Sequence, residues 1–202
     1  YVRHSRRLLQ ERAAAGKLSE AARKELVGIA KNNADPTRVQ RAMWALHVTG
    51  GLPADLAAAL LKHQSPYVRG WVIELSWDGG KSPSPEMVQQ FAVMAQQDSS
   101  PVVRLFIAAA LQHVAPADRW ATLEALTRHA EDADDHNLPL MYWYAAEPLA
   151  AVDPGRALKL GLSCGKTIPL LRKFMIRRIG SSFRDAIRAS DFLVDIGPGA
   201  GI

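Results

Sequence analysis

The sequence predicts an all-α fold, a right-handed solenoid of about five stacked helix pairs. The main observation is a turn motif in which arginine follows a proline by three residues, with apolar residues between them. The motif recurs at residues 66–69, 101–104 and 169–172, with looser copies at 35–39 and 137–141. Its spacing of about 30 to 40 residues is typical of a helical repeat. The second observation is the apolar run after the motif, as in 102–111, since a helix that is apolar nearly all round must be buried between neighbours.

Each turn is suited to begin a helix. Asp35, Ser65 and Ser100 each precede a repeat proline, and their side-chain oxygens can accept a hydrogen bond from a free N–H group of the first helical turn. Proline costs nothing at the first helical position, because its missing N–H would have had no partner there. We therefore expect these three residues to be helix caps.

We call the helix that a repeat proline begins an inner helix and the helix that precedes it an outer helix. Inner helices are expected at residues 36–49, 66–77, 101–113, 138–150 and 168–179. Outer helices are expected at 19–31, 53–62, 84–97 and 116–130, with a short one from 153. Residues 2–15 form a leading inner helix without an outer partner. Glycine pairs at 50–51 and 79–80 end two inner helices, since glycine takes the left-handed cap conformation without strain.

The repeats divide the chain into two regions. Residues 1–180 form the solenoid, truncated at its N-terminal end, and residues 181–202 form a short helix and an irregular glycine-rich tail. Residues 192–196 are the first stretch that alternates as a strand does. Tyr1 falls inside a copy of the motif, so we expect the chain to be a segment of a longer protein.

Composition limits the possible functions. The net charge of +5 permits an acidic partner, and nucleic acid among them, without requiring one. Cys164 is the single cysteine, which excludes an intrachain disulfide and any zinc or haem motif built on cysteine pairs. No apolar stretch approaches the roughly 18 residues that a membrane span needs, so no membrane insertion is expected.

Large aromatic residues recur at one offset from the repeat proline. Trp71, Phe106, Tyr144 and Phe174 each lie five residues after it. One aromatic at one offset predicts a core stripe along the stack. Three further tryptophans, Trp77, Trp120 and Trp143, fall off this register and are the better candidates for an exposed contact, although burial is still the favoured interpretation for them.

Arginines recur in the same way. Arg69, Arg104 and Arg172 lie three residues after the proline, and Arg3 matches them in the cut first copy. We expect a structural ladder in which each arginine reaches carboxylates or helix-end carbonyls of the adjacent repeat. A row of arginines presented to an anionic partner is the alternative.

The densest group of potential metal ligands lies at residues 129–136, where two histidines flank four acidic residues. The segment has neither the glycine nor the terminal glutamate of a calcium loop, and its histidine spacing does not suit zinc. It is expected to be an acidic interhelix loop that helps to cap the next helix, so no metal site is predicted.

Catalytic motifs are lacking, since no nucleophile elbow, phosphate loop or paired-carboxylate signature occurs. We therefore expect no catalytic residue, no cofactor and no enzymatic activity in this segment. Asp78 beside Trp77 in a basic helical-repeat chain is similar in type to the alkylpurine DNA glycosylases of that architecture, which use an aspartate with tryptophans and an arginine in a concave groove. Nucleic-acid binding of this kind is the alternative function.

A set of segments in the middle of the chain resembles one family. These are SPVVRL at 100–105, RW at 119–120, HAEDADD at 129–135, NLPLM at 137–141, WYAAEPL at 143–149 and IPLLRKF at 168–174. They resemble the HEAT-like segment of large bacterial haem-binding, membrane-bound dehydrogenases, over roughly residues 35–180. The resemblance implies a HEAT- or armadillo-like solenoid between a propeller-type dehydrogenase domain and a c-type cytochrome domain, in the cell envelope or periplasm.

No haem site is implied for this chain, because Gly165 follows the lone cysteine where the family has Cys-x-x-Cys-His. The resemblance implies a non-catalytic scaffold or interaction module of a redox protein. Its partner is expected to be another protein or the neighbouring domain, docked on the basic terminal helix. The residues expected to bind the partner are Arg172, Lys173, Arg177 and Arg178. The alternative for this helix is a solvated capping face.

Overall fold

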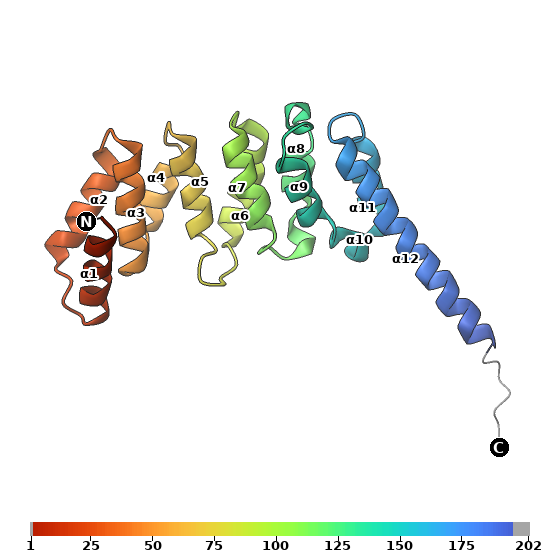
Figure 1. Ribbon diagram of the computed structural model, residues 1–202, viewed down its shortest axis with the longest axis horizontal. Helices are drawn as coiled ribbons and strands as arrows, with labels where there is room; N and C mark the ends of the chain where they lie inside the picture. Colours follow the sequence, from red (N-terminus) through yellow and green to blue (C-terminus); the bar gives the residue numbers. More distant parts are fainter. Residues whose placement is uncertain (1, 196–202) are drawn as a thin grey trace, which may run out of the picture. The chain divides into compact units, whose positions relative to one another are not determined.

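The computed structural model describes the backbone of residues 2–195 and the side chains of residues 3–181, 183 and 184. All regular structure in these residues is helical, and no strand occurs among them, so the all-α prediction is confirmed (Figure 1). The chain divides into two compact units, Tyr1–Ser82 and Pro83–Ile202. We describe each unit by itself.

The first unit consists of five helices in two layers (Figure 1). They are α1 (Val2–Ala14), α2 (Glu20–Asn32), α3 (Pro36–Val48), α4 (Ala54–Leu60) and α5 (Pro66–Leu75). Helix α3 packs between α1 and α5, and these three make one layer. Helix α2 packs on α3 and helix α4 packs on α5. Helices α2 and α4 also pack on each other and make the second layer.

The second unit contains the remaining helices. They are α6 (Pro85–Gln97), α7 (Pro101–Leu111), η1 (Pro116–Asp118), α8 (Trp120–Leu126), η2 (Ala130–Asp132), α9 (Leu138–Ala146), α10 (Leu149–Val152), α11 (Pro154–Ser163) and α12 (Pro169–Asp195). Helix α9 packs against both α7 and α12. Helix α6 packs on α7 and α8, and α11 packs on α10 and α12.

The core follows one position of the repeat. The residue six after the repeat proline is buried in all five inner helices. These residues are Ala42, Val72, Ile107, Ala145 and Met175. Residues two or three after the proline extend the same stripe one turn earlier, as Val103 does, because positions three and four apart share a helix face.

Only some predicted caps form. The Asp35 carboxylate accepts a hydrogen bond of 2.8 Å from the Thr37 amide, as expected. The prediction for Ser65 and Ser100 is wrong, since neither side chain accepts a bond from its helix. Arg69 and Arg104 bind these two turns instead. Each guanidinium donates to a carbonyl oxygen six residues earlier, that of His63 at 2.7 Å and that of Asp98 at 3.1 Å.

The last helix is longer than predicted. Helix α12 continues through residue 179, where an end was expected, as far as Asp195, and residues 192–195 are helical, not extended. A single helical glycine, Gly180, does not stop it, since one glycine costs a helix only about 1 kcal/mol. The glycine-rich run at 197–201 lies outside the described residues.

Candidate functional site

The aromatic residues five after the repeat proline do not form the predicted core. Trp71, Phe106 and Phe174 are only half-buried, and Tyr144 is 52% exposed. The reason is angular, because the fifth position lies one residue, or about 100°, away from the buried sixth position. These side chains therefore lie at the edge of the core stripe.

Two of these edge aromatics contact another ring across a pair of inner helices. Trp71 on α5 meets Trp44 on α3 edge to face, with ring centroids 4.8 Å apart. Phe174 on α12 meets Trp143 on α9 in the same way at 5.4 Å. The fifth position thus joins neighbouring inner helices near the surface. Off the register, Trp120 is buried and not exposed, with the Arg156 guanidinium 4.4 Å from its ring centroid.

The four arginines that were predicted to form a ladder differ in their burial and in their partners. Arg104 is buried and donates two hydrogen bonds to the Asp132 carboxylate, at 2.7 and 2.5 Å. Tyr142 on α9 donates to the same carboxylate at 2.6 Å, and burial followed by this bond raises the pKa of Tyr142. The network joins α7, η2 and α9 in the interior of the second unit.

The other ladder positions are less buried. Arg69 donates to the carbonyl oxygens of His63 and Gln64 within its own turn. Arg172 is exposed beside Gly165, where an added Cβ would approach its Cδ to 2.7 Å. Arg3 is exposed on α1 and lines a cleft of the first unit.

The acidic loop caps a helix, as expected. Asp135 accepts hydrogen bonds from the amides of Asn137 and Leu138, at 2.8 and 2.9 Å, at the start of α9. The Leu138 bond, then the Asn137 bond, lower the pKa of Asp135. Within the described part of the chain, no three His, Cys, Asp or Glu side chains gather as a metal site requires.

The four basic residues predicted to bind a partner point to different neighbours. Arg178 donates to Glu147, the residue directly after α9, at 2.5 Å, so it ties α12 to the unit. Arg172 lies against the α11–α12 turn. Lys173 and Arg177 are exposed and four residues apart, hence on one face of α12.

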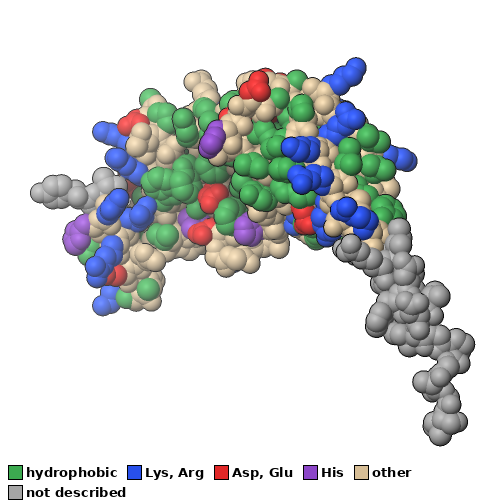
Figure 2. All heavy atoms as spheres, turned by 45° about the vertical axis from the view of Figure 1, so that its right-hand side comes forward, with side chains coloured by type: hydrophobic (Ala, Val, Ile, Leu, Met, Phe, Trp, Pro, Cys, Tyr) green, Lys and Arg blue, Asp and Glu red, His purple; other side chains and the backbone are tan. Residues whose placement is uncertain are grey.

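Sequence reasoning missed an apolar surface beside these two cations. Four large exposed apolar side chains lie on the last helix pair, α11 and α12. We call them the terminal face; they are Leu158 (37% exposed), Leu162 (52%), Ile176 (41%) and Phe183 (59%). Leu158 and Leu162 are four residues apart on α11, on the side away from Arg156, which turns back to Glu124 and Trp120 on α8. Figure 2 shows hydrophobic side chains among Lys and Arg over the end of this unit from which α12 extends.

A second missed site is a cleft of about 590 Å³ in the first unit, lined by α1, α3, α5 and the turn after α5. Its lining residues are Arg3, Arg6, Arg41, Trp44, His47, Val48, Trp71, Glu74, Leu75 and Asp78. Asp78 bonds to the His47 imidazole at 2.7 Å. Desolvation, and then the negative charge of Asp78, raise the pKa of Glu74. The similarity to the alkylpurine DNA glycosylases paired Asp78 with Trp77, but Trp77 is not among the residues that line this cleft.

Comparison with models of protein families, with curated proteins and with solved structures finds no match for this chain. None of the described helices is both long and apolar enough to cross a membrane.

Proposed function

We propose that this chain is a non-catalytic scaffold and interaction module, a right-handed HEAT- or armadillo-like solenoid that docks a neighbouring part of its parent protein. The observation that carries the proposal is the terminal face, formed by Leu158, Leu162, Ile176 and Phe183. A helical repeat buries its apolar sides only by stacking on a neighbour. An exposed apolar side on the last described pair therefore favours a covering partner over a solvated cap.

The charges beside the terminal face favour an acidic partner. Lys173 and Arg177 project from the exposed side of α12 next to Ile176, whereas Arg178 is engaged with Glu147. An acidic surface would be steered toward these two cations, and the contact would weaken with salt. The apolar side chains would supply most of the affinity, because desolvated anchors dominate interface energies.

The solenoid arrangement rests on the helix packing within each unit. In the first unit α3 packs between α1 and α5, with α2 and α4 as the other layer, and in the second α9 packs between α7 and α12. The five buried positions six after each proline also support equivalent repeats. The resemblance to the HEAT-like segment of haem-binding dehydrogenases supports a redox parent in the cell envelope, with its haem on another domain.

The test uses, as a separate polypeptide, the c-type cytochrome domain that the resemblance implies after the helical repeats, and measures its affinity by calorimetry. Leu162→Asp and the pair Lys173→Glu with Arg177→Glu should each weaken binding about tenfold or more. The control pair, Arg38→Glu with Lys62→Glu, changes exposed cations of the first unit and should leave binding unchanged.

Melting temperatures show whether a variant has lost binding alone or has also lost stability. All of these variants should melt within a few degrees of the parent chain, because surface substitutions rarely change stability by more than about 0.5 kcal/mol. Unfolding of the Lys173 and Arg177 double variant would show that these cations hold the last repeat together. Equal affinities for the docking variants and the controls would remove the proposal.

One observation favours DNA binding as a second candidate. The first-unit cleft brings three arginines, Trp44, Trp71 and Asp78 together, which are the residue types used by the helical-repeat glycosylases. Titration with alkylated duplex DNA at low and physiological salt tests it. Release of the alkylated base that is lost in Asp78→Asn would support the enzyme, and the absence of salt-sensitive binding would exclude it.

A further inference from the structure

The first-unit cleft has the size and lining of a small-molecule site. Its volume of about 590 Å³ falls in the range of ligand pockets, roughly 300–1,000 Å³. Three separate helices contribute to the lining, so the site depends on the packing of α1 and α5 on α3.

Two aromatic rings line the cleft. Trp44 and Trp71 are half-buried and meet at an interplanar angle of 77°. The indole nitrogen of Trp44 is buried without a hydrogen-bond partner among the described residues, although a buried N–H normally has one. Arg6 already holds its planar guanidinium 5.6 Å from the Trp44 centroid, so the face of this ring accepts a planar, delocalised group.

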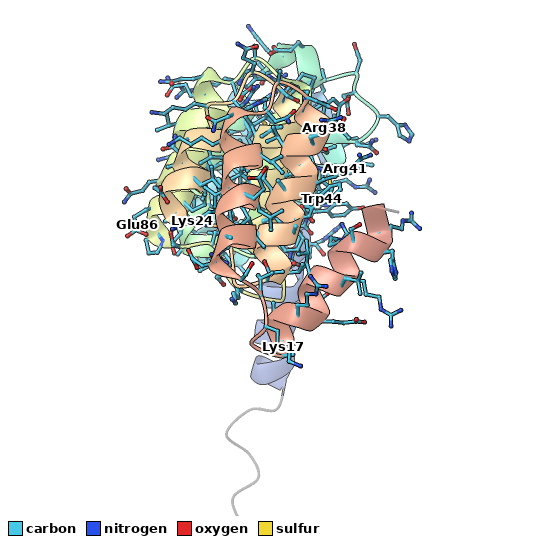
Figure 3. The ribbon with its side chains drawn as sticks, turned by 90° about the vertical axis from the view of Figure 1, so that its left-hand side faces the viewer. Lys17, Lys24, Arg38, Arg41, Trp44 and Glu86 are labelled. Carbon is cyan, nitrogen blue, oxygen red and sulfur yellow. The ribbon has the colours of Figure 1, made fainter. Side chains whose placement is uncertain are left out.

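The charges of the cleft are ordered along its helices. On α3, Arg41 lies one turn before Trp44 and His47 one turn after it. Figure 3 shows Arg41 and Trp44 on the same side of the helix. On α5, Glu74 follows Trp71 by one turn, and Asp78 lies in the turn after α5, where it meets His47. Arg3 and Arg6 of α1 add to the positive charge.

We propose that this cleft binds a small planar aromatic ligand that carries an anionic group at one end and an N–H donor at the other, as an aminopurine mononucleotide does. The arginines receive the phosphate or carboxylate, because guanidinium pairs with such groups in a bidentate manner. The ligand ring stacks on one of the indoles of Trp44 and Trp71 and meets the edge of the other, since the two indoles lie at 77° and aromatic stacking suits any planar base. Glu74 and Asp78 accept hydrogen bonds from the amino group.

The test uses adenosine 5′-monophosphate as probe, with calorimetry and quenching of tryptophan fluorescence as readouts. Adenosine lacks the anion, ribose 5-phosphate lacks the ring, and purine riboside 5′-monophosphate lacks the amino group. Each should bind about tenfold more weakly than the probe or worse. Indole-3-acetate carries a carboxylate in place of the phosphate. If it binds as tightly as the probe, the ligand of the cleft is an aromatic carboxylate and not a phosphate.

Variants locate the binding in the cleft. Arg41→Ala and Trp71→Leu should each weaken binding of the probe at least about fivefold, as loss of a charge-assisted contact or of a stacking platform does. Arg38→Ala is the matched control, because Arg38 lies one turn before Arg41 on α3 and does not line this cleft. A melting curve of each variant shows that it is folded, and Arg41 is exposed, so its truncation leaves the core intact.

Three outcomes would overturn the proposal. One is no heat and no quenching with any probe up to about 1 mM, the weakest binding that such a site would show. A second is equal affinity for the probe and its three truncated forms. The last is equal weakening by Arg38→Ala and Arg41→Ala, which would indicate a diffuse charge effect.

Discussion

At the scale of single residues, Arg104 and Asp132 form a buried ion pair. Both residues are about 1% exposed, and the carboxylate also accepts a hydrogen bond from the Tyr142 hydroxyl. Removal of one partner from such a pair leaves a buried charge, which costs about 3–5 kcal/mol.

We therefore expect Arg104→Met to lower the unfolding free energy by about 3–5 kcal/mol in denaturant melts. The control, Lys173→Met, removes an exposed cation of the same unit and should cost less than about 0.5 kcal/mol. A similar small loss in both variants would mean that the Arg104 network contributes little to stability.

Cys164 offers a second test at this scale. Burial raises the pKa of its thiol to about 11, and its side chain is 2% exposed. Because the thiolate is the reactive form, the native protein at pH 8 should react with a disulfide reagent far more slowly than the unfolded chain. Rapid labelling without denaturant would contradict this burial.

Glu74 gives a pH dependence with a defined sign. Its folded pKa is raised above the ordinary value of 4.5, first by desolvation and then by Asp78. The charged form of Glu74 is therefore disfavoured in the folded state, and its ionisation lowers the free energy of unfolding. This loss of stability is absent below pH 4.5 and develops as the pH rises through the folded pKa. Glu74→Gln should raise the melting temperature at pH 7, and the gain should shrink as pH falls toward 4.5. A gain that is independent of pH would contradict the assignment.

At the scale of the helix, the sequence predicted the start of each inner helix well, because a proline marks it. It did not predict the side chains that meet across helices. The partner of Arg104 lies 28 residues away, at Asp132, in a loop whose acidic residues all look alike in sequence. The first-unit cleft needs the packing of α1, α3 and α5, which no local pattern specifies.

The edge position of the aromatics was predicted wrongly for a related reason. Aromatic residues that recur at the same distance from the repeat proline occupy equivalent positions in their helices. The prediction took this equivalence as a sign of burial. The fifth position recurs as regularly as the sixth, but only the sixth faces the core, as Phe106 and Ile107 show. A difference of one residue, or about 100° on a helix, separates the two cases.

This geometry revises the expected cost of core substitutions. From the sequence, Trp71→Ala and Phe106→Ala should each cost about 3–5 kcal/mol, the penalty for a buried aromatic. Because Phe106 is half-buried and Ile107 is fully buried, we now expect Ile107→Ala to cost about 2–5 kcal/mol and Phe106→Ala to cost less than Ile107→Ala. Denaturant melts of the two single variants decide the order, and a larger loss for Phe106→Ala would restore the core assignment.

At the scale of the whole molecule, each unit is built mainly from contacts between helices that are close in sequence, as α2 with α3 or α7 with α9. This low contact order favours rapid folding, since little chain entropy is lost before native contacts form. It also explains why elements could be predicted from local signals alone, whereas the terminal face and the cleft depend on how whole helices pack.

The same locality determines how the chain responds to tension. A helix pair of about 35 residues lengthens to about 120 Å when its backbone is drawn straight. Because each pair is held mainly by its neighbours in sequence, we expect a pull on the two ends to release the pairs in succession rather than all at once. If domains were attached at both ends, the chain would act between them as an extensible spring, which absorbs a displacement in steps and recoils as the pairs refold.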